Sequence, residues 1–171
     1  MNKKELVENV KYIVLGIVTA YLFNLVLGLA LDTDLPVVAV VSESMTHDVT
    51  TELHHYQFLE ENYGYTREQI DSWPLKNGFR KGDVLIIKGV NRDELEVGDV
   101  IVYNIDSEGR GIPIVHRIIK IDKNEIVTKG DHNIVEDQWN IGKIRGKAVF
   151  VIPYIGWPKL VLTYILSAVF R

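Results

Sequence analysis

The sequence predicts a mainly β protein: an antiparallel β domain with a small helical insertion, an N-terminal transmembrane helix and a short apolar C-terminal helix. Three observations favour this fold class. Residues 12–31 form an uncharged apolar run, residues 46–80 carry apolar side chains at helical spacing, and short apolar segments separated by turn residues follow residue 80. Several short strands without helical crossovers between them are typical of an antiparallel sheet.

The apolar run at residues 12–31 predicts a membrane anchor. About 20 helical residues rise roughly 30 Å, which is enough to cross the hydrocarbon core of a bilayer. A buried soluble helix would normally keep a polar face, and this run has none. A cleaved signal peptide is the stronger alternative, because Gly28-Leu29-Ala30 has small residues at its two ends. Its apolar region would be only about 7–15 residues long, so we expect an uncleaved anchor.

The charges that flank this run predict its orientation. Three lysines lie within residues 1–11, whereas Asp32 and Asp34 follow the run. Positive charge favours the cytoplasmic side of a membrane. We therefore expect a cytoplasmic segment at residues 1–11 and a β domain at residues 32–155 that lies outside the cytoplasm, tethered to the cell membrane.

Residues 46–80 predict two helices inserted into the β domain. Apolar residues recur at helical spacing before Gly64: Leu53, Tyr56, Leu59 and Tyr63. Thr66 and Gln69 have the spacing of a capping box for a second short helix. That helix must end before Pro74, because the residue before a proline disfavours the helical conformation.

The insertion also contains three histidines, His47, His54 and His55, which are candidate metal ligands. Adjacent His54 and His55 would point to different faces of a helix, so a shared ion would need a third ligand from elsewhere. Histidines of this kind are usually solvated. We therefore expect surface histidines, no metal site and no cofactor.

The rest of the domain predicts short strands. Gly82-Asp83 and Gly98-Asp99 are turns that each lead into an apolar segment. The expected strands cover residues 35–41, 84–87, 100–103, 114–119 with an extension to Ile121, 125–128 and 147–151.

The last segment, residues 156–171, is apolar after Lys159 but too short to predict a second span. Pro153 and Pro158 separate it from the last strand. We expect a short helix lying in or on the membrane beside the anchor. A helix packed on the β domain is the alternative.

Composition limits the chemistry. The formal net charge of −4 disfavours a nucleic-acid partner. The chain has no cysteine, which excludes disulfides, a thiol nucleophile and a thiolate zinc site. Any catalysis must therefore use serine, histidine, carboxylates, lysine or a histidine–carboxylate metal site.

Five polar residues are candidates for a catalytic site. Ser42 and Ser44 follow the first expected strand and would point the same way in an extended segment, so both hydroxyls could face one carbonyl. His116 lies in an apolar strand, and Asp131 and Asp137 lie in later turns. Each residue alone also has an ordinary structural explanation, as a turn former, a core histidine or a turn aspartate.

In combination, these segments resemble the type I signal peptidases, in the archaeal and endoplasmic-reticulum branch. Ser44-Met45 is similar to the nucleophile box of that family, with Ser42 as its other serine, and Val115-His116-Arg117 is similar to its base box. The segment 129–133, Lys-Gly-Asp-His-Asn, resembles its acidic box, with Asp137 beyond it. Gly82-Asp83-Val84 and Gly98-Asp99-Val100 fit the intervening strands. The resemblance runs from the anchor to Tyr154 and omits the insertion.

Two positions depart from the family pattern. Thr46-His47-Asp48 stands where many relatives have a proline soon after the Ser-Met pair. His132 replaces the first asparagine of the acidic box, which places a second histidine near the expected site. We keep His116 as the expected base because its box matches.

The resemblance implies a membrane-anchored serine endopeptidase with the β fold of signal peptidases, which removes signal peptides after small residues at −1 and −3. Ser44 would be the nucleophile and His116 the general base, oriented by Asp131 or Asp137. The Ser44 N–H and the Ser42 hydroxyl would stabilise the oxyanion. The implied partners are signal-peptide-bearing preproteins, the lipid bilayer and the secretion translocon.

Two other functions are open at this point. A non-catalytic, membrane-tethered β module would bind or position secretory substrates without cleaving them. A histidine-dependent metallohydrolase is the third candidate, and the chain has no His-Glu-x-x-His motif in its favour.

Overall fold

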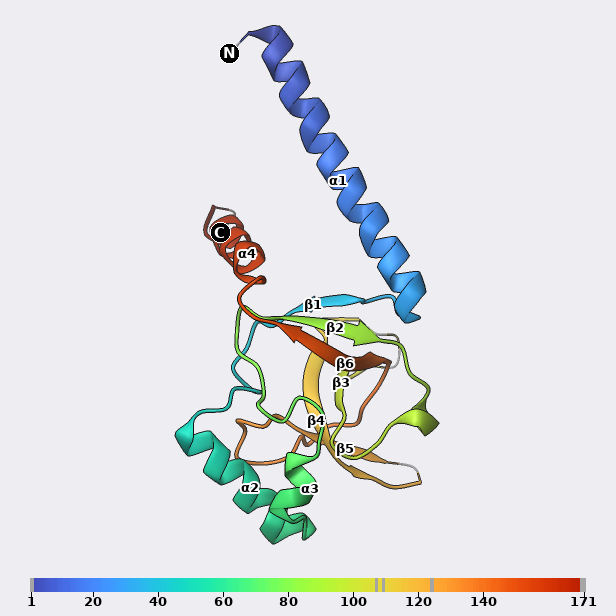
Figure 1. Cartoon of the computed structure of the whole chain (residues 1–171), viewed down its shortest axis with the longest axis vertical. Coiled ribbons are helices and arrows are strands. Elements are labelled where there is room, and N and C mark those ends of the chain that lie inside the picture. Colours follow the sequence, from blue (N-terminus) through green and yellow to red (C-terminus); the bar gives the residue numbers. More distant parts are fainter. Residues whose placement is uncertain (1, 107, 109, 124, 170–171) are drawn as a thin grey trace.

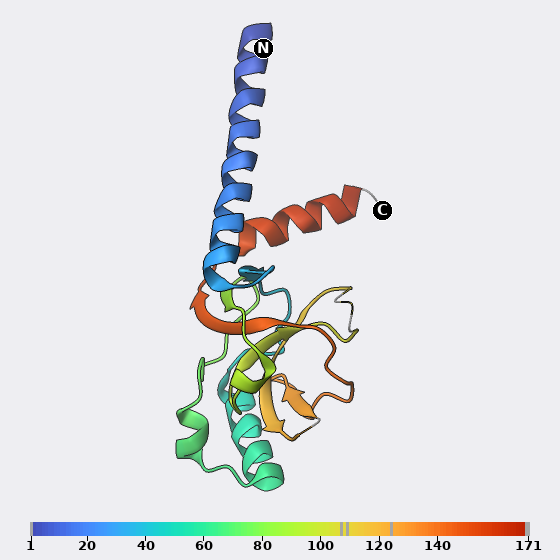
Figure 2. The same cartoon turned by 90° about the vertical axis from the view of Figure 1, so that its right-hand side faces the viewer.

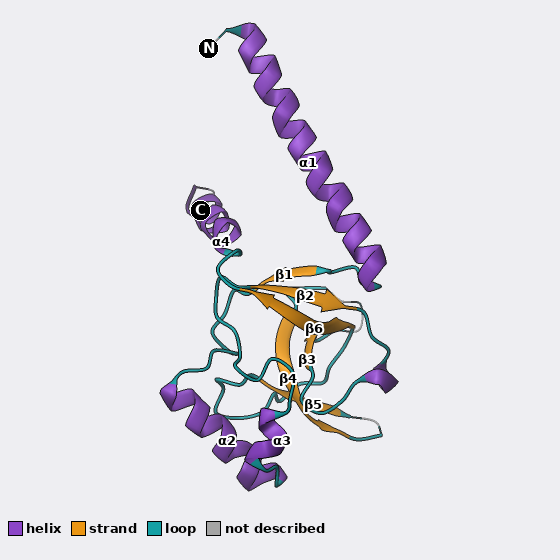
Figure 3. Cartoon of the chain, viewed as in Figure 1, coloured by secondary structure: helices purple, strands orange, loops and turns teal. Residues whose placement is uncertain are grey.

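The computed structural model describes residues 2–106, 108, 110–123 and 125–169. It contains one six-stranded antiparallel sheet in the order β1-β2-β6-β3-β4-β5 (Figure 1). The strands are β1 (Val37–Ala39), β2 (Val84–Lys88), β3 (Val100–Tyr103), β4 (Ile114–Ile121), β5 (Ile126–Lys129) and β6 (Ile144–Ile152). With the helices at either end and in the insertion, this confirms the predicted fold class (Figure 3).

Helix α1 (Lys3–Leu31) includes the expected anchor and continues toward the N-terminus through most of the polar segment. Asn2 and Glu5 form a capping box at its start, and Asp32 ends it in the left-handed conformation, with φ of 53°. No described side chain of α1 is buried, and the helix projects away from the sheet (Figure 1). Among the described residues, this helix is long and apolar enough to cross a membrane, by length and composition.

The base of α1 is attached to the β domain by backbone contacts. The amide of Gly89, just after β2, donates to the Leu31 carbonyl at 2.7 Å. A Cβ atom at position 89 would lie 1.8 Å from the Asp32 carbonyl oxygen, so this approach requires glycine. The Thr33 hydroxyl donates to the Arg145 carbonyl of β6.

The insertion contains α2 (Val49–Tyr63) and α3 (Arg67–Asp71), as its periodicity predicts. The Thr66–Gln69 capping box is present in both directions. Apolar side chains of the two helices pack on strand β4 in one buried cluster: Tyr56, Leu59, Ile70 and Ile119. Leu53, expected on the same face, is exposed.

Strand β3 lies at the centre of the β domain and is buried along its whole length. Its side chains alternate between two apolar clusters. Val100 and Val102 pack in a cluster that includes Met45, whereas Ile101 and Tyr103 pack with Ile118 of β4. Successive residues of β3 therefore point to opposite faces of the sheet and contact different clusters.

Helix α4 (Trp157–Val169) leaves the end of β6 on the side of the sheet from which α1 projects (Figures 1 and 2). Its first turn is fixed to the turn before β2, since Gly156 donates its amide to the Gly82 carbonyl at 2.8 Å. Farther along α4, five large apolar side chains are exposed: Val161, Leu162, Tyr164, Ile165 and Leu166. The alternative in which this helix packs along the β domain therefore does not describe the structure.

Candidate active site

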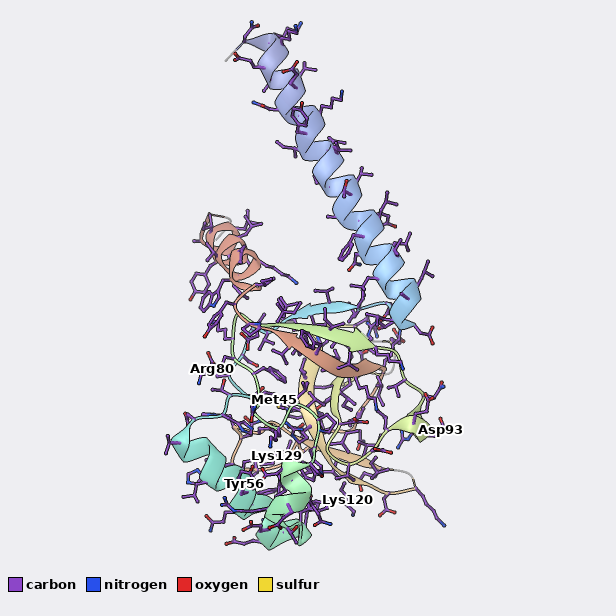
Figure 4. All side chains as sticks on the ribbon, in the orientation of Figure 1. Met45, Tyr56, Arg80, Asp93, Lys120 and Lys129 are labelled. Atoms are coloured by element: carbon purple, nitrogen blue, oxygen red, sulfur yellow. The ribbon has the colours of Figure 1, made fainter. Side chains whose placement is uncertain are left out.

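The two serines lie in a turn after β1 that is held to the core by Met45. The Met45 side chain is 1% exposed, and its carbonyl accepts a hydrogen bond from the Phe79 amide at 3.0 Å. Figure 4 shows Met45 in the interior of the β domain. Ser42 is exposed and Ser44 is partly exposed, with their Oγ atoms 3.2 Å apart. Anchoring of the intervening backbone thus presents both hydroxyls at one place on the surface.

His116 is held in place by Asp137. It lies on β4 opposite Ile101, and its side chain is almost completely buried. Its Nδ1 is 2.7 Å from Asp137 Oδ2. If Nδ1 carries the proton and donates it to the carboxylate, Nε2 becomes the basic nitrogen, which is the arrangement a general base requires.

Asp137 is itself fixed by several hydrogen bonds. Its amide donates to the Thr128 carbonyl at 2.9 Å, and its Oδ2 accepts from the Thr128 hydroxyl at 2.6 Å. The same oxygen accepts from the Tyr103 hydroxyl at 3.0 Å. The nearly buried carboxylate is therefore satisfied by donors from three strands, β3, β4 and β5.

Asp131 occupies a different environment. It forms a bidentate ion pair with Arg117, in which Nε and Nη2 lie 2.9 and 2.7 Å from the two carboxylate oxygens. Both side chains are buried. The Arg117 guanidinium also donates to the carbonyls of Pro74 and Leu75, which connects β4 to the chain just after α3. Burial opposes ionisation of Asp131, but Arg117 and His47 outweigh it and hold its pKa well below the usual range.

The two histidines nearest to Asp131 are not solvated, so that prediction is wrong for His47 and His55. The Nε2 of His47 lies 2.9 Å from Asp131 Oδ2, and the side chain of His55 is 2% exposed, with Nδ1 3.8 Å from Asp131 Oδ1. His55 precedes Leu59 by one helical turn, so it shares the buried face of α2. Only His54, which points to another face, is exposed as expected.

These three groups also form the cluster best suited to a metal ion within the described part of the chain. One ligand atom from each of His47, His55 and Asp131 lies within 4.8 Å of the others. However, Arg117 already donates to both oxygens of Asp131, and the buried ammonium of Lys129 donates to the Asp131 carbonyl. A divalent cation would add its charge beside two cations. The cluster is therefore better suited to hydrogen bonding than to metal binding.

The burial of His55 predicts an acid-sensitive stability. Burial lowers its pKa to about 4, with Lys129, Arg117 and His47 acting in the same direction and Asp131 opposing them. The unfolded chain takes up this proton near pH 6.5, so between pH 6.5 and 4 the unfolded state binds more protons than the folded state. We expect the free energy of unfolding to fall by about 3 kcal/mol across this window because of His55.

Denaturant unfolding of the full chain in detergent at a series of pH values measures this effect. His55→Phe should lose the corresponding part of the pH dependence, whereas His54→Phe, at the exposed neighbouring position, should keep it. Equal pH dependence in the wild type and in His55→Phe would contradict this explanation.

A cleft of about 570 Å³ connects the serines to the histidine. Its walls come from β1, the following turn and the start of β4, and they are mainly apolar. Ser42, Ser44 and His116 all line the cleft. Apolar side chains beside them include Val38, Val40 and Val115. Trp139, in the segment before β6, and Lys159, on α4, also line the cleft. Residues far apart in the sequence thus meet around one open space.

Part of the chain is similar in sequence to catalytic subunits of signal peptidase complexes. The chain is 31% identical to the signal peptidase complex catalytic subunit SEC11C of Homo sapiens, over 53% of this chain and 54% of that protein. It is 45% identical to the signal peptidase complex catalytic subunit SEC11 of Scheffersomyces stipitis, over 54% of this chain and 62% of that protein. These similarities support a relationship to the type I signal peptidases of the endoplasmic-reticulum and archaeal branch. No protein-family model matches it.

The similarity to these signal peptidases covers part of each protein. The SEC11 of Lodderomyces elongisporus is 44% identical over a similar region. The chain spans little more than half the length of the curated relatives it matches.

The structure brings Ser42, Ser44 and His116 around one cleft and pairs His116 with Asp137. It pairs the other candidate, Asp131, with Arg117. The exposed His132 contacts the backbone of the serine turn, with its amide donating to the Ser44 carbonyl at 2.8 Å and its Nδ1 lying 3.3 Å from the Thr46 carbonyl.

Sequence reasoning missed three residues around the histidine: Tyr103, Thr128 and Trp139. Thr128 offers a weak signal, since it lies directly before the Lys-Gly-Asp segment. Tyr103 is the polar end of an otherwise aliphatic strand, and Trp139 follows Asp137 by two positions. Nothing in their spacing indicates that they meet, because they lie on β3, on β5 and in the segment before β6.

Proposed function

We propose that this chain is a membrane-anchored serine endopeptidase that removes N-terminal signal peptides from exported preproteins. Ser44 attacks the scissile carbonyl, and His116 takes the proton from its hydroxyl as general base. Asp137 orients the imidazole and stabilises the imidazolium that forms. The observation that carries the proposal is the cleft lined by both serines and by a histidine whose other nitrogen is held by a carboxylate.

The Ser42 hydroxyl and the Ser44 amide are the proposed oxyanion donors. The 3.2 Å separation of the two Oγ atoms supports this role, since a carbonyl attacked by Ser44 develops its negative charge within reach of Ser42. A donor that is already oriented costs little reorganisation in the transition state.

An extended peptide fits the cleft. β1 is an edge strand, so its outer side has backbone groups with which a substrate strand can pair. The side chains at −1 and −3 of such a strand point to the same face. Apolar side chains of β1 and β4 line this cleft. In this proposal they accept small residues at −1 and −3.

Processing of a preprotein by the purified chain in liposomes tests this proposal. We expect one cleavage, located by mass spectrometry of the new N-terminus, that is lost when the −1 alanine of the substrate is replaced by phenylalanine. Binding of the preprotein without cleavage would instead favour a non-catalytic module that positions substrates.

We also propose that α1 spans the membrane, with the β domain on its extracytoplasmic side, and that α4 lies in the membrane interface. Helix α4 lies on the same side of the sheet as α1 (Figure 2). Its exposed apolar side chains are preceded by exposed Tyr154 and Ile155, just after β6. Such a helix buries its apolar face among lipid headgroups. This arrangement keeps the cleft near the membrane, where a signal peptide leaves the bilayer.

Tryptophan fluorescence with brominated lipids measures this placement. In a chain that keeps only Trp157, at the start of α4, we expect strong quenching by bromine near the headgroups. In the matched chain that keeps only Trp73, which packs on Gly98 in the β domain, quenching should be weak. Equal quenching of the two indoles would contradict the interfacial position of α4.

A further inference from the structure

We propose that Trp139 and Tyr103 are positioning residues that couple the occupancy of the cleft to the Asp137–His116 pair. The indole N–H of Trp139 orients the Tyr103 hydroxyl, and the hydroxyl in turn fixes Asp137. A peptide in the cleft that contacts the indole would thereby hold the acid and base in their working geometry. The inference rests on the proposed peptidase function.

The contacts form one continuous chain. Trp139 Nε1 donates to the Tyr103 hydroxyl oxygen at 3.1 Å. The Tyr103 hydroxyl donates to Asp137 Oδ2 at 3.0 Å, and this oxygen lies 2.7 Å from His116 Nδ1. The Thr128 hydroxyl, 3.0 Å from that of Tyr103, donates to the same carboxylate oxygen at 2.6 Å.

The direction of these hydrogen bonds is fixed by donor chemistry. An indole N–H can only donate, so the Tyr103 oxygen accepts the hydrogen bond from Trp139. The Tyr103 hydroxyl must therefore donate its own hydrogen to a different acceptor. Asp137 Oδ2 lies 3.0 Å away and accepts it. Burial, together with the negative charge of Asp137, raises the pKa of the Tyr103 hydroxyl above its ordinary value, so the hydroxyl keeps its proton and stays a donor.

Trp139 also connects this chain to the substrate. Its side chain is 40% exposed and lines the cleft that contains the serines. Trp139 also lines a second, polar pocket, and Glu136, Asp137 and Gln138 form part of the same lining. The indole therefore has an exposed surface that a bound peptide can contact, while its N–H is bonded to Tyr103. Contact with a peptide restrains the ring, and the restraint reaches Asp137 through Tyr103.

The test compares two substitutions of Trp139 that remove different parts of the side chain. Trp139→Phe keeps an aromatic surface in the cleft and removes the N–H, so kcat should fall by about 3–10-fold, the effect of losing one neutral hydrogen bond, while KM changes little. Trp139→Ala removes both, so KM should rise as well. Trp73→Phe is the matched control away from the cleft.

The pH profile separates positioning from general damage. Tyr103→Phe removes a donor to Asp137, which leaves more negative charge to stabilise the imidazolium. The midpoint of the rising limb of kcat/KM should therefore move to higher pH. Tyr65→Phe, which removes a hydroxyl bonded to the Ile119 carbonyl, should leave the midpoint unchanged. Loss of folded protein would lower all rates equally without moving the midpoint.

Unchanged kcat and midpoint in both Trp139→Phe and Tyr103→Phe, or equal changes in the two control variants, would overturn the proposal. Failure of the underlying peptidase function would be recognised separately, because the wild type would then show no cleavage or Ser44→Ala would cleave at the wild-type rate. With an active wild type and an inactive Ser44→Ala, the kinetics of these variants decide the positioning role alone.

Discussion

Ser44→Ala is expected to reduce preprotein cleavage by roughly 10⁶-fold, the scale seen when the nucleophile of a serine peptidase is removed. Alanine leaves Met45 and the backbone of the turn in place, so the fold and its melting temperature should be unchanged. The rate of appearance of the mature N-terminus, measured in liposomes, gives the effect. Ser72→Ala, an exposed serine of the insertion, is the matched control and should cleave normally.

Ser42→Ala separates the two serine roles. Because Ser42 is proposed to donate a hydrogen bond to the oxyanion and not to attack, its loss should cost about 10²–10³-fold in kcat and leave measurable activity. If Ser42→Ala abolished cleavage and Ser44→Ala retained it, the two roles would be exchanged.

Asp137→Asn and Asp131→Asn should fail in different ways. Asparagine at 137 cannot stabilise the imidazolium and favours the wrong tautomer of His116, so kcat should fall by about 10⁴-fold while the chain stays folded. Asparagine at 131 leaves the buried Arg117 guanidinium without its counter-charge, which should lower the free energy of unfolding by roughly 3–5 kcal/mol. Denaturant unfolding and kcat, measured on both variants, distinguish the two effects.

Under conditions in which Asp131→Asn is still folded, its kcat should stay within about tenfold of the wild type. Asp131 bonds to Arg117 and His47, whereas Asp137 holds the imidazole of His116. A stable Asp131→Asn variant with a kcat as low as that of Asp137→Asn would show that Asp131 also orients His116 or stabilises its imidazolium.

The separate environments of the two aspartates follow from strand geometry. His116 and Arg117 are neighbours on β4, and successive side chains of a strand point to opposite faces. One aspartate therefore meets the imidazole and the other meets the guanidinium. The sequence contains this alternation, but it leaves open which aspartate lies on which face, because that depends on how the loop after β5 folds back.

Local signals predicted most of the fold. The Thr66–Gln69 capping box, the Gly-Asp turns and most of the apolar strands each depend on neighbours in the sequence, and the structure confirms them. The first strand is shorter than expected, covering Val37–Ala39 of residues 35–41. His47 and His55 were mispredicted as solvated because their shared polar partner, Asp131, lies far along the chain. Long-range polar contacts of this kind have no periodic signal.

The extent of the site was predictable only in part. Ser42, Ser44 and His116 were selected as members of recognisable segments, and they line one cleft. Tyr103, Thr128 and Trp139 belong to no such segment, and their hydrogen bonds arise only when β3 and β5 join the same sheet as β4. Positioning groups around a catalytic pair therefore had to come from the structure.

Covalent trapping tests the central claim most directly. A signal-peptide-derived peptide with an electrophilic phosphonate in place of the scissile carbonyl, incubated with the full chain in liposomes, should modify one residue, which peptide mapping by mass spectrometry identifies. The proposed mechanism predicts an adduct on Ser44 Oγ that forms far more slowly in His116→Ala. An adduct on another residue, or labelling of Ser44 at an unchanged rate without His116, would contradict it.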